Sequence, residues 1–556
     1  MKVSEMPYIR PNKEALIVEL NNLNEQFNKA KSAEEQKTII DAYTETLNHF
    51  STMQNISYIR FTLNTNDEFY MQEKDYFDSI TPELQLAAQA CTDSLLSSKY
   101  IDELKKFYPP VVFQNLEIER KTINKEILPM LVEENNLVTK YDQLINNVII
   151  EYKGEKYTPS TISKFFSNED REVRKSATIA FGEEMMKISN ELDESFDALV
   201  KVRTAIARKL GYENFIELGY YRMCRNCYDK NDVAKFRANV KKYIVPLVSE
   251  IKEKIKQKFG WDRINIYDDG RYTDREPKPI GTPTEIFEQG SKMYNELSPI
   301  TGKLFDRMVA DEAIDYMPKK GKWGGGYCTD IYDFKTPFIL ANFNESSHDI
   351  EVLTHEFGHA LAFEKGFDLG FNQSSPTYES CEVHSMSMEF LTYPWMEKFF
   401  GDNVANFKFS HLSSALAFLS YGTIVDYFQQ LVYENPDMTP AERNALWLKL
   451  DTEFLPHMTQ EDLPFYKEGR RWQRQMHIYE TPFYYIDYCF AQFTAFQILS
   501  LSQQDYKSAF DKYMKFLYAG GTKTYTELLE YAELKSPFNE QAFKEVCKVV
   551  ENMLIK

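Results

Sequence analysis

Apolar residues recur at intervals of three and four along most of the chain, which is the spacing of one face of an α-helix. The repeat is clear near the start in Leu16, Leu20, Leu23 and Phe27. It continues to about residue 145 and resumes from Ser160 to about Lys258. Within the first stretch, Thr81-Pro82-Glu83 offers a cap residue followed by proline, and so predicts a helix that begins there. The pattern predicts a mainly helical protein with a minor sheet.

Two stretches interrupt the helical pattern. Residues 148–152 are strand-like, and Lys153-Gly154-Glu155 predicts a turn into a second short strand. We take this hairpin as the end of an amino-terminal helical domain, residues 1–160, and residues 161–556 as a second domain. From Gly260 to Pro283 the chain predicts loops and short strands, after which Thr282 and Glu285 have the spacing of a capping box.

A third interruption lies at residues 324–343. Three glycines are followed by two runs, residues 327–334 and the strand-like residues 337–343. A strand beside an active site can pair with an extended peptide and orient its backbone. A buried strand after a glycine hinge is the alternative reading of this stretch. The candidate substrate-binding residues are Gly325, Gly326, Tyr327, Ile339, Ala341 and Asn342.

Composition narrows the classes of partner. The chain has 556 residues, 43% of them hydrophobic and 27% charged, which is typical of a folded globular protein. Its net charge of −19 argues against nucleic acid and anionic membranes, because both are polyanions. The amino terminus has no signal-like apolar run, and no later stretch approaches 18 uninterrupted apolar residues. We therefore expect a cytoplasmic protein, in which the seven cysteines are reduced.

The candidate chemistry centres on His355-Glu356-Phe357-Gly358-His359. Two histidines four residues apart share one helical face and can bind one zinc ion, and the glutamate between them can take a proton from a water that the zinc activates. With eight histidines and 84 acidic residues in the chain, chance alone would produce about 0.02 such motifs. Ile350, Leu353, Phe357 and Leu361 recur at helical spacing and predict the buried side of this helix.

A catalytic zinc needs a third protein ligand. The candidates lie on a second predicted helix, residues 378–390, and are Glu379, Glu382, His384 and Glu389. One carboxylate can bind the metal while another holds a ligating histidine. Spacing alone leaves the choice open.

These motifs resemble the thimet oligopeptidase and oligoendopeptidase F group of zinc peptidases, and are most similar to its bacterial Pz-peptidase branch. The resemblance rests on His-Glu-Phe-Gly-His at 355–359, Glu-Val-His-Ser at 382–385, residues 337–343, and the run from His477 to Tyr488. It implies that Glu382 is the third zinc ligand, beside His355 and His359, and that Glu356 is the general base. It also implies that His477, Tyr485 and Tyr488 stabilise the oxyanion of the reaction.

The resemblance further implies a helical bowl or clam around a deep central channel, with a small sheet beside the zinc helix. Such a channel would admit short unfolded peptides, so we expect a zinc-dependent oligoendopeptidase. A carboxydipeptidase of the same family and a non-catalytic peptide-binding protein are the alternatives. An arginine near the site, such as Arg470, Arg471 or Arg474, could meet a substrate carboxylate, although a solvated basic face is the simpler reading.

Overall fold

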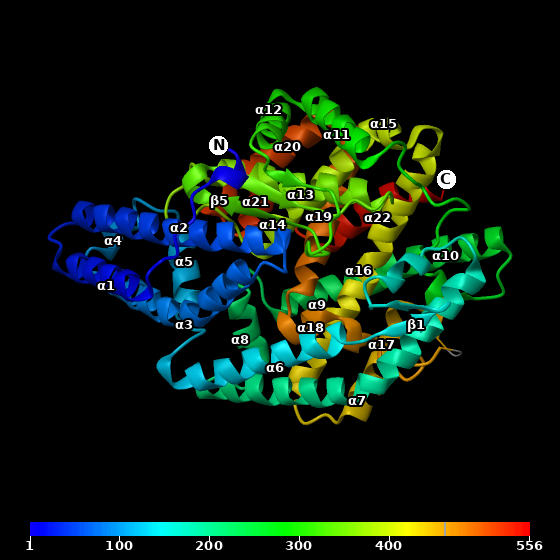
Figure 1. Cartoon of the computed structure of the whole chain (residues 1–556), viewed down its shortest axis with the longest axis horizontal. Coiled ribbons are helices and arrows are strands. Elements are labelled where there is room, and N and C mark those ends of the chain that lie inside the picture. The colour runs from blue at the N-terminus through cyan, green and yellow to red at the C-terminus, as the bar shows by residue number, and fades with distance from the viewer. Residues whose placement is uncertain (461–462, 556) are drawn as a thin grey trace. The chain divides into compact units, whose positions relative to one another are not determined.

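The computed structural model describes residues 1–460 and 463–555, and shows a predominantly helical chain with three small sheets among these residues (Figure 1). This confirms the predicted fold class. The chain forms two compact units, each built from three segments. Unit 1 comprises Met1–Arg120, Pro277–Val404 and Leu501–Leu534, and unit 2 comprises Lys121–Glu276, Ala405–Ser500 and Lys535–Lys556. The domain boundary at residue 160, and the bowl with a deep channel, stay predictions.

The helices of unit 1 come from all three of its segments. They are α1 (Lys13–Lys29), α2 (Ala33–Leu63), α3 (Glu68–Leu96), α4 (Ile101–Leu104), α5 (Pro110–Glu119), α11 (Pro283–Leu297), α12 (Pro299–Ala310), α13 (His348–Gly366), α14 (Tyr378–Leu391), α15 (Glu397–Phe400), α20 (Tyr506–Ala519) and α21 (Tyr525–Tyr531). Helix α11 begins with the predicted capping box, in which the Thr282 hydroxyl accepts the backbone N–H of Glu285.

Helix α3 does not begin at Thr81, as the sequence predicted. It runs without a break through Pro82, fourteen residues after its first residue, Glu68. The Thr81 hydroxyl donates to the carbonyl of Phe77 one turn earlier. Phe77, Ile80 and Leu84 are all buried on one face, so packing of that face outweighs the local cost of an internal proline.

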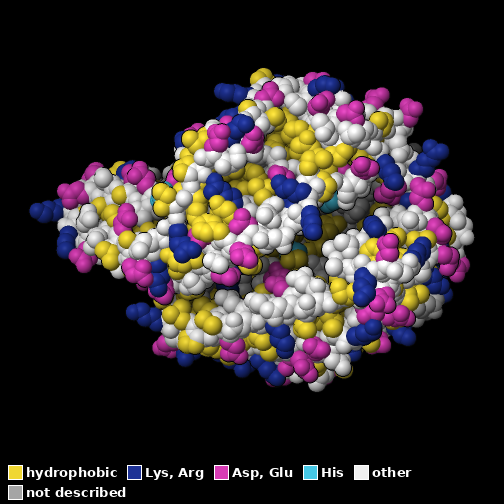
Figure 2. Space-filling model, viewed as in Figure 1, with side chains coloured by type: hydrophobic (Ala, Val, Ile, Leu, Met, Phe, Trp, Pro, Cys, Tyr) yellow, Lys and Arg dark blue, Asp and Glu magenta, His cyan; other side chains and the backbone are white. Residues whose placement is uncertain are grey.

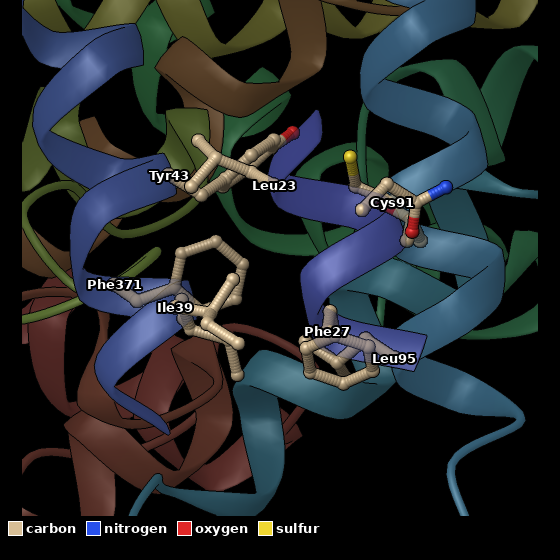
Figure 3. Close-up of a pocket in the computed structure, with 10 residues that line it drawn as sticks. Leu23, Phe27, Ile39, Tyr43, Cys91, Leu95 and Phe371 are labelled. Carbon is tan, nitrogen blue, oxygen red and sulfur yellow. The ribbon is translucent and has the colours of Figure 1, made fainter. Parts of the chain in front are cut away.

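A small apolar pocket lies among α1, α2 and α3. Figure 3 shows Leu23 and Phe27 of α1, Ile39 and Tyr43 of α2, Cys91 and Leu95 of α3, and Phe371 from the segment between α13 and α14. The Phe371 ring packs edge-on against Tyr43 and Tyr108, with centroids 6.3 and 5.9 Å away. The cavity measures about 30 Å³, well below the roughly 150 Å³ of an apolar cavity that binds benzene. Phe371 thus ties the first segment of unit 1 to the second.

The sheet of unit 1 has the strand order β4-β6-β5. Its strands are β4 (Ile314–Asp315), β5 (Tyr327–Ile331) and β6 (Thr336–Leu340). Strand β6 is the middle strand, parallel to β4 and antiparallel to β5. Both β5 and β6 pack against α13, as predicted for a small sheet beside the histidine-bearing helix.

Unit 2 is also helical. Its helices are α6 (Leu128–Asn146), α7 (Arg171–Lys209), α8 (Phe215–Arg222), α9 (Lys230–Asn239), α10 (Val245–Phe259), α16 (Val404–Glu434), α17 (Pro440–Phe454), α18 (Met476–Glu480), α19 (Tyr485–Ser502) and α22 (Glu540–Leu554). Two short strands, β3 (Ile264–Asn265) and β7 (Met458–Thr459), pair in parallel. β3 lies in the stretch where loops and short strands were predicted.

The predicted hairpin forms in unit 2. Strands β1 (Ile150–Tyr152) and β2 (Glu155–Tyr157) pair antiparallel, with Tyr152 opposite Glu155. The two turn residues, Lys153 and Gly154, have φ of 51° and 82°. Positive φ at both positions is the mark of the tight turn that matches strand twist, and glycine adopts it without strain.

The surface mixes charges of both signs. Figure 2 shows acidic and basic side chains interspersed over the face in view. Within residues 1–460 and 463–555, no helix combines the length and the hydropathy needed to cross a bilayer.

Helices α13 and α14 approach each other closely at Gly358. A Cβ atom at Gly358 would lie 2.3 Å from the carbonyl oxygen of His384 and 2.7 Å from the Cα of Ser385. Both are backbone positions that cannot rotate away. The Tyr513 hydroxyl of α20 donates to the same His384 carbonyl at 2.9 Å and so ties α20 to this point of α14.

We expect Gly358→Ala to lower the free energy of unfolding by about 3 kcal/mol, because the overpacked methyl group must push the two helices apart. In an open helix the same change would add about 1 kcal/mol of stability, so the sign of the effect tests the contact. The measurement is chemical denaturation. Gly324→Ala is the control, since its Cβ would meet nothing within 4 Å. Equal or greater stability of Gly358→Ala would contradict the close approach.

Candidate active site

Packing of its apolar face fixes the orientation of α13, the helix that carries the two histidines. Ile350, Leu353, Phe357 and Leu361 are at most 2% exposed, as their spacing predicted. The Phe357 ring lies against Tyr294 of α11, with centroids 3.9 Å apart. At the start of α13, both Asp349 carboxylate oxygens accept backbone N–H groups of the preceding loop, from Asn344 and Glu345. The opposite face of α13 therefore has a defined orientation.

On that opposite face, His355 and His359 meet the Glu382 carboxylate of α14. The two Nε2 atoms lie 3.4 and 3.5 Å from the same oxygen, Glu382 Oε2. The three ligand atoms all lie within 4.8 Å of one another. In a tetrahedral zinc site with bonds of about 2.0–2.1 Å, ligand atoms lie about 3.4 Å apart. The residues present, two imidazoles and a carboxylate, therefore fit a zinc ion.

Neighbouring side chains orient these donors. Glu389 Oε1 lies 2.7 Å from His355 Nδ1, so Nδ1 carries the hydrogen and Nε2 presents its lone pair to the site. The Ser385 hydroxyl donates to Glu382 Oε2 at 3.0 Å. Of the other candidates, Glu379 accepts a hydrogen bond from the Thr377 hydroxyl, and His384 is only 1% exposed with its ring against Phe516. Burial lowers the pKa of His384 to about 3.

Charges in this cluster compensate one another. Burial alone would lower the pKa of His355, but hydrogen bonds to Glu382 and Glu389 outweigh it and raise that pKa well above its usual value. Burial would raise the pKa of Glu382, but the nearby histidines hold it well below the usual range. The site therefore favours an ionised carboxylate, as a cation site requires.

Glu356, the acidic residue of the motif, lies on the side of α13 that faces the sheet. It is 8% exposed, and burial raises its pKa although His355 and His359 oppose the shift. A Cβ at Gly326 would lie 3.8 Å from Glu356 Oε1, and 3.4 Å from the carbonyl oxygen of Leu340. The chain leading into β5 thus passes directly beside this carboxylate, and glycine keeps the approach open.

The predicted substrate-binding residues occupy different places in the sheet. Ile339 and Ala341 are buried, and their backbone N–H groups donate toward β4, to Ala313 and Asp315. With β5 on its other edge, β6 has no side for a further strand. The Asn342 amide donates to the carbonyls of Trp323 and Gly325, so it shapes the glycine loop. An added peptide strand would have to pair with an edge strand, β4 or β5, and β5 is the one that begins beside Glu356.

His477, Tyr485 and Tyr488 come together in unit 2. His477 is on the short helix α18, and the two tyrosines lie on the first turn of α19. Ring centroids are 4.9 Å apart for His477 and Tyr485, and 6.0 Å apart for His477 and Tyr488. All three side chains are partly exposed, so their polar atoms can meet a ligand.

A buried ion pair anchors this cluster, and the sequence reading missed it. Arg225 Nη2 lies 3.0 Å from Asp487 Oδ1, and both side chains are fully buried. Arg225 also donates to the carbonyl of Phe483, whose N–H donates to Gln429 at 3.0 Å. Phe483 has φ of 71°, a strained value for a bulky residue. These contacts hold the bend between α18 and α19.

The sequence held one weak signal for this anchor. Arg225 lies in Cys224-Arg225-Asn226-Cys227, a cysteine spacing that metal and redox pairs share but that is weak evidence when it stands alone. In the described structure the two cysteines form no disulfide. The residue of this stretch that supports the site is Arg225, through its ion pair with Asp487. Periodicity cannot identify a buried arginine whose partner is 262 positions away.

Comparisons with known proteins cover nearly the whole chain. A model described as Peptidase M3 N-terminal domain matches residues 3–123, and one described as Peptidase family M3 matches residues 165–547. Oligopeptidase PepF of Bacillus subtilis (strain 168) is 23% identical over 476 residues, which are 83% of this chain and 68% of that protein. The Oligoendopeptidase F homolog of Borreliella burgdorferi is 21% identical, and the match covers 93% of this chain and 91% of that protein.

One solved structure, of PZ peptidase A with an inhibitor, is more similar. It is 42% identical, with a TM-score of 0.95, and the match covers 100% of this chain and 99% of that chain.

We expect Glu389→Gln to weaken zinc binding about 10- to 100-fold, because the amide keeps a hydrogen bond to His355 but loses the charge that strengthens the imidazole as a ligand. The measurement is the zinc dissociation constant by competition with a chelator. Glu397→Gln is the control, since Glu397 is an exposed glutamate at the start of α15. Unchanged affinity would refute the assigned role of Glu389.

Glu480, at the end of α18, should make stability depend on pH. Burial and the adjacent Asp142 carboxyl raise the pKa of Glu480 to about 7. Because this folded-state pKa lies above the unfolded value of about 4.5, the protonated form stabilises the fold at low pH, and that contribution is lost as pH rises through 7.

We therefore expect Glu480→Gln, which mimics the protonated form, to raise the Tm relative to wild type at pH 8.5 and to leave it nearly unchanged at pH 5. Differential scanning calorimetry at both values checks this. Glu191→Gln, an exposed glutamate of α7, should change neither. The same Tm difference at both pH values for Glu480→Gln would rule the idea out.

Proposed function

Because the chain belongs to peptidase family M3, we propose that it is a zinc-dependent oligoendopeptidase, which hydrolyses internal bonds of short, unfolded peptides. The observation that carries the proposal is the convergence of His355, His359 and Glu382 next to a buried Glu356. Peptide hydrolysis needs an activated water and a proton carrier. Helix α13 carries two of the metal ligands and the proton carrier, and α14 carries the third ligand.

His355, His359 and Glu382 would hold the metal. Zinc at this site would supply Lewis-acid chemistry, activating water and polarising the scissile carbonyl. Glu389 keeps His355 in the tautomer whose Nε2 can bind, and Ser385 keeps the Glu382 carboxylate in place.

Glu356 would carry the proton. A carboxylate oxygen of Glu356 takes the proton of the attacking water as general base, and returns it to the leaving nitrogen as general acid. Its burial raises its pKa, which brings the carboxyl closer to the neutral range in which it must both accept and release a proton.

The outer edge of β5 would orient the substrate backbone. Pro337 lacks an N–H, so its pair with Asp330 is a non-hydrogen-bonded one, and by alternation the same holds for Cys328 opposite Ile339. The peptide groups of Cys328 and Asp330 therefore point to the outer edge. The Asp330 carbonyl already accepts from Asn55 of α2, which leaves the Cys328 end, next to Gly326 and Glu356, for an extended peptide.

His477, Tyr485 and Tyr488 would donate hydrogen bonds to the oxyanion that forms when water adds to the carbonyl. Donors aimed at that oxygen in advance are commonly worth about 2.7–4 kcal/mol each. Their clustering within unit 2 and their match to the family motif support this role. The predicted channel would restrict substrates to unfolded peptides of limited length.

A carboxydipeptidase remains the second candidate function. It would need a cation for the substrate's terminal carboxylate. Arg470 lies 3.1 Å from Asp193, and Arg471 lies 4.0 Å from Asp451, each with less than a fifth of its side chain exposed. The predicted solvated basic face is therefore wrong for Arg470 and Arg471. Each already faces an aspartate, so neither has a free positive charge for a substrate carboxylate. Of the three arginines only Arg474 is exposed, so a carboxydipeptidase reading would have to rest on Arg474.

We expect wild type to cleave an internally quenched peptide of about ten residues with both ends blocked, a length of about 33 Å when extended. Glu356→Gln should lose at least about 100-fold in kcat/KM, because general-base catalysis contributes about 10²–10⁴. Mass spectrometry locates the cleaved bond, and metal analysis should find zinc retained in Glu356→Gln.

The outcomes separate the candidates. Cleavage only after the carboxy terminus is freed would support the carboxydipeptidase. Equal rates for wild type and Glu356→Gln would overturn the assigned base. No cleavage of either peptide by zinc-loaded wild type would leave a peptide-binding protein.

A further inference from the structure

Gln475 links His477 to the interior of unit 2. It lies immediately before α18, between the imidazole and Tyr421 of α16. The Tyr421 hydroxyl is 2.9 Å from Gln475 Oε1, and Gln475 Nε2 is 2.8 Å from His477 Nδ1. The three side chains thus form one hydrogen-bonded chain that ends on an imidazole nitrogen.

The direction of the hydrogens in this chain follows from Tyr421. The Arg471 guanidinium lies over its ring, 4.5 Å from the centroid. A cation on the ring makes the phenol a better donor and its oxygen a poorer acceptor. Tyr421 therefore donates to Gln475, which fixes the oxygen of the amide on that side and the NH₂ group on the histidine side.

The orientation of the Gln475 amide decides which nitrogen of His477 carries the hydrogen. With its NH₂ group toward the ring, Gln475 donates to His477, so Nδ1 is an acceptor and the ring hydrogen resides on Nε2. Protonating Nδ1 as well would set two donors face to face. The arrangement disfavours the imidazolium ion and keeps the ring hydrogen on Nε2.

We propose that Gln475 is a positioning residue that holds His477 as the neutral, Nε2-protonated tautomer, so that the imidazole always presents a hydrogen-bond donor to the oxyanion. The catalytic part of this inference rests on the proposed peptidase function. The tautomer itself does not, because it is a property of the protein without substrate.

Three tyrosine rings pack around the imidazole of His477. Tyr484, Tyr485 and Tyr488 face its ring, with centroids 5.9, 4.9 and 6.0 Å away. Burial raises the pKa of Tyr485 well above its usual value, so it stays neutral. The Arg471 guanidinium acts on this hydrogen-bonded chain through the ring of Tyr421.

The test exchanges the donor for an acceptor. Gln475→Glu places a carboxylate where the NH₂ group was, so Nδ1 should become protonated and the imidazolium should be stabilised. Gln475→Met removes the contact at similar volume. Histidine labelled with ¹⁵N in the ring, assigned with His477→Gln, reports the tautomer by NMR in the absence of peptide.

We expect the Nε2–H signature in wild type, and an Nδ1–H signature with a titration midpoint raised by at least one pH unit in Gln475→Glu. With the blocked peptide, Gln475→Met should lower kcat about 10- to 100-fold, with KM changed less than about threefold. The kcat of Gln475→Glu should also become more pH-dependent around neutrality. Gln257→Met, at an exposed glutamine of α10, is the matched control for folding and activity.

The results test the tautomer and the peptidase function separately. An Nδ1–H tautomer in wild type, or kcat and NMR spectra unchanged in both variants, would overturn the proposal while leaving the Glu356 test intact. A protein that binds zinc, cleaves no peptide and still shows the Nε2–H tautomer would refute the peptidase function, and with it the catalytic role of Gln475, but not the tautomer assignment.

Discussion

The site depends on how closely α13 and α14 can approach. Imidazoles from one helix and a carboxylate from the other meet on a single oxygen, at 3.4 and 3.5 Å, only because the backbones nearly touch at Gly358. Any side chain at that position would separate the two sets of ligands. The glycine inside the metal motif is thus a packing requirement set by the neighbouring helix, and it carries no chemistry itself.

That convergence gathers buried charge, which is costly without compensation. Leaving one partner of a buried pair uncompensated costs about 3–5 kcal/mol. Here Glu382 and Glu389 both face His355, and Ser385 donates to the ligand oxygen. The cluster carries more negative than positive formal charge when the imidazoles are neutral. A divalent cation would balance it, so the electrostatics and the ligand geometry favour the same occupant.

The sequence predicted the local features well because their causes are local. The buried face of α13, the hairpin turn at Lys153-Gly154 and the capping box at Thr282 each follow from residues a few positions apart. It failed at Pro82, where burial of Phe77 and Leu84 carries the helix through a proline. Among the carboxylates of α14 it left the roles open, because spacing gives the helical face but not the partner on the opposite helix. The roles of Arg225 and Gln475 could not be predicted for the same reason, because their partners lie on other elements.

The two groups of functional side chains are stabilised in different ways. The metal-type cluster is held by regular helices packed at a glycine, which tolerates no local adjustment. The His477 cluster sits on a bend whose Phe483 backbone is strained at φ of 71°, and a buried ion pair with two backbone hydrogen bonds holds it there. Such strain persists only where the surroundings over-determine the conformation. A bend of this kind sets the ring of His477 against Tyr485 and Tyr488, which a continuous helix from α18 into α19 would carry to other faces. The strained bend is therefore what allows three donors within eleven positions of the sequence to face one another.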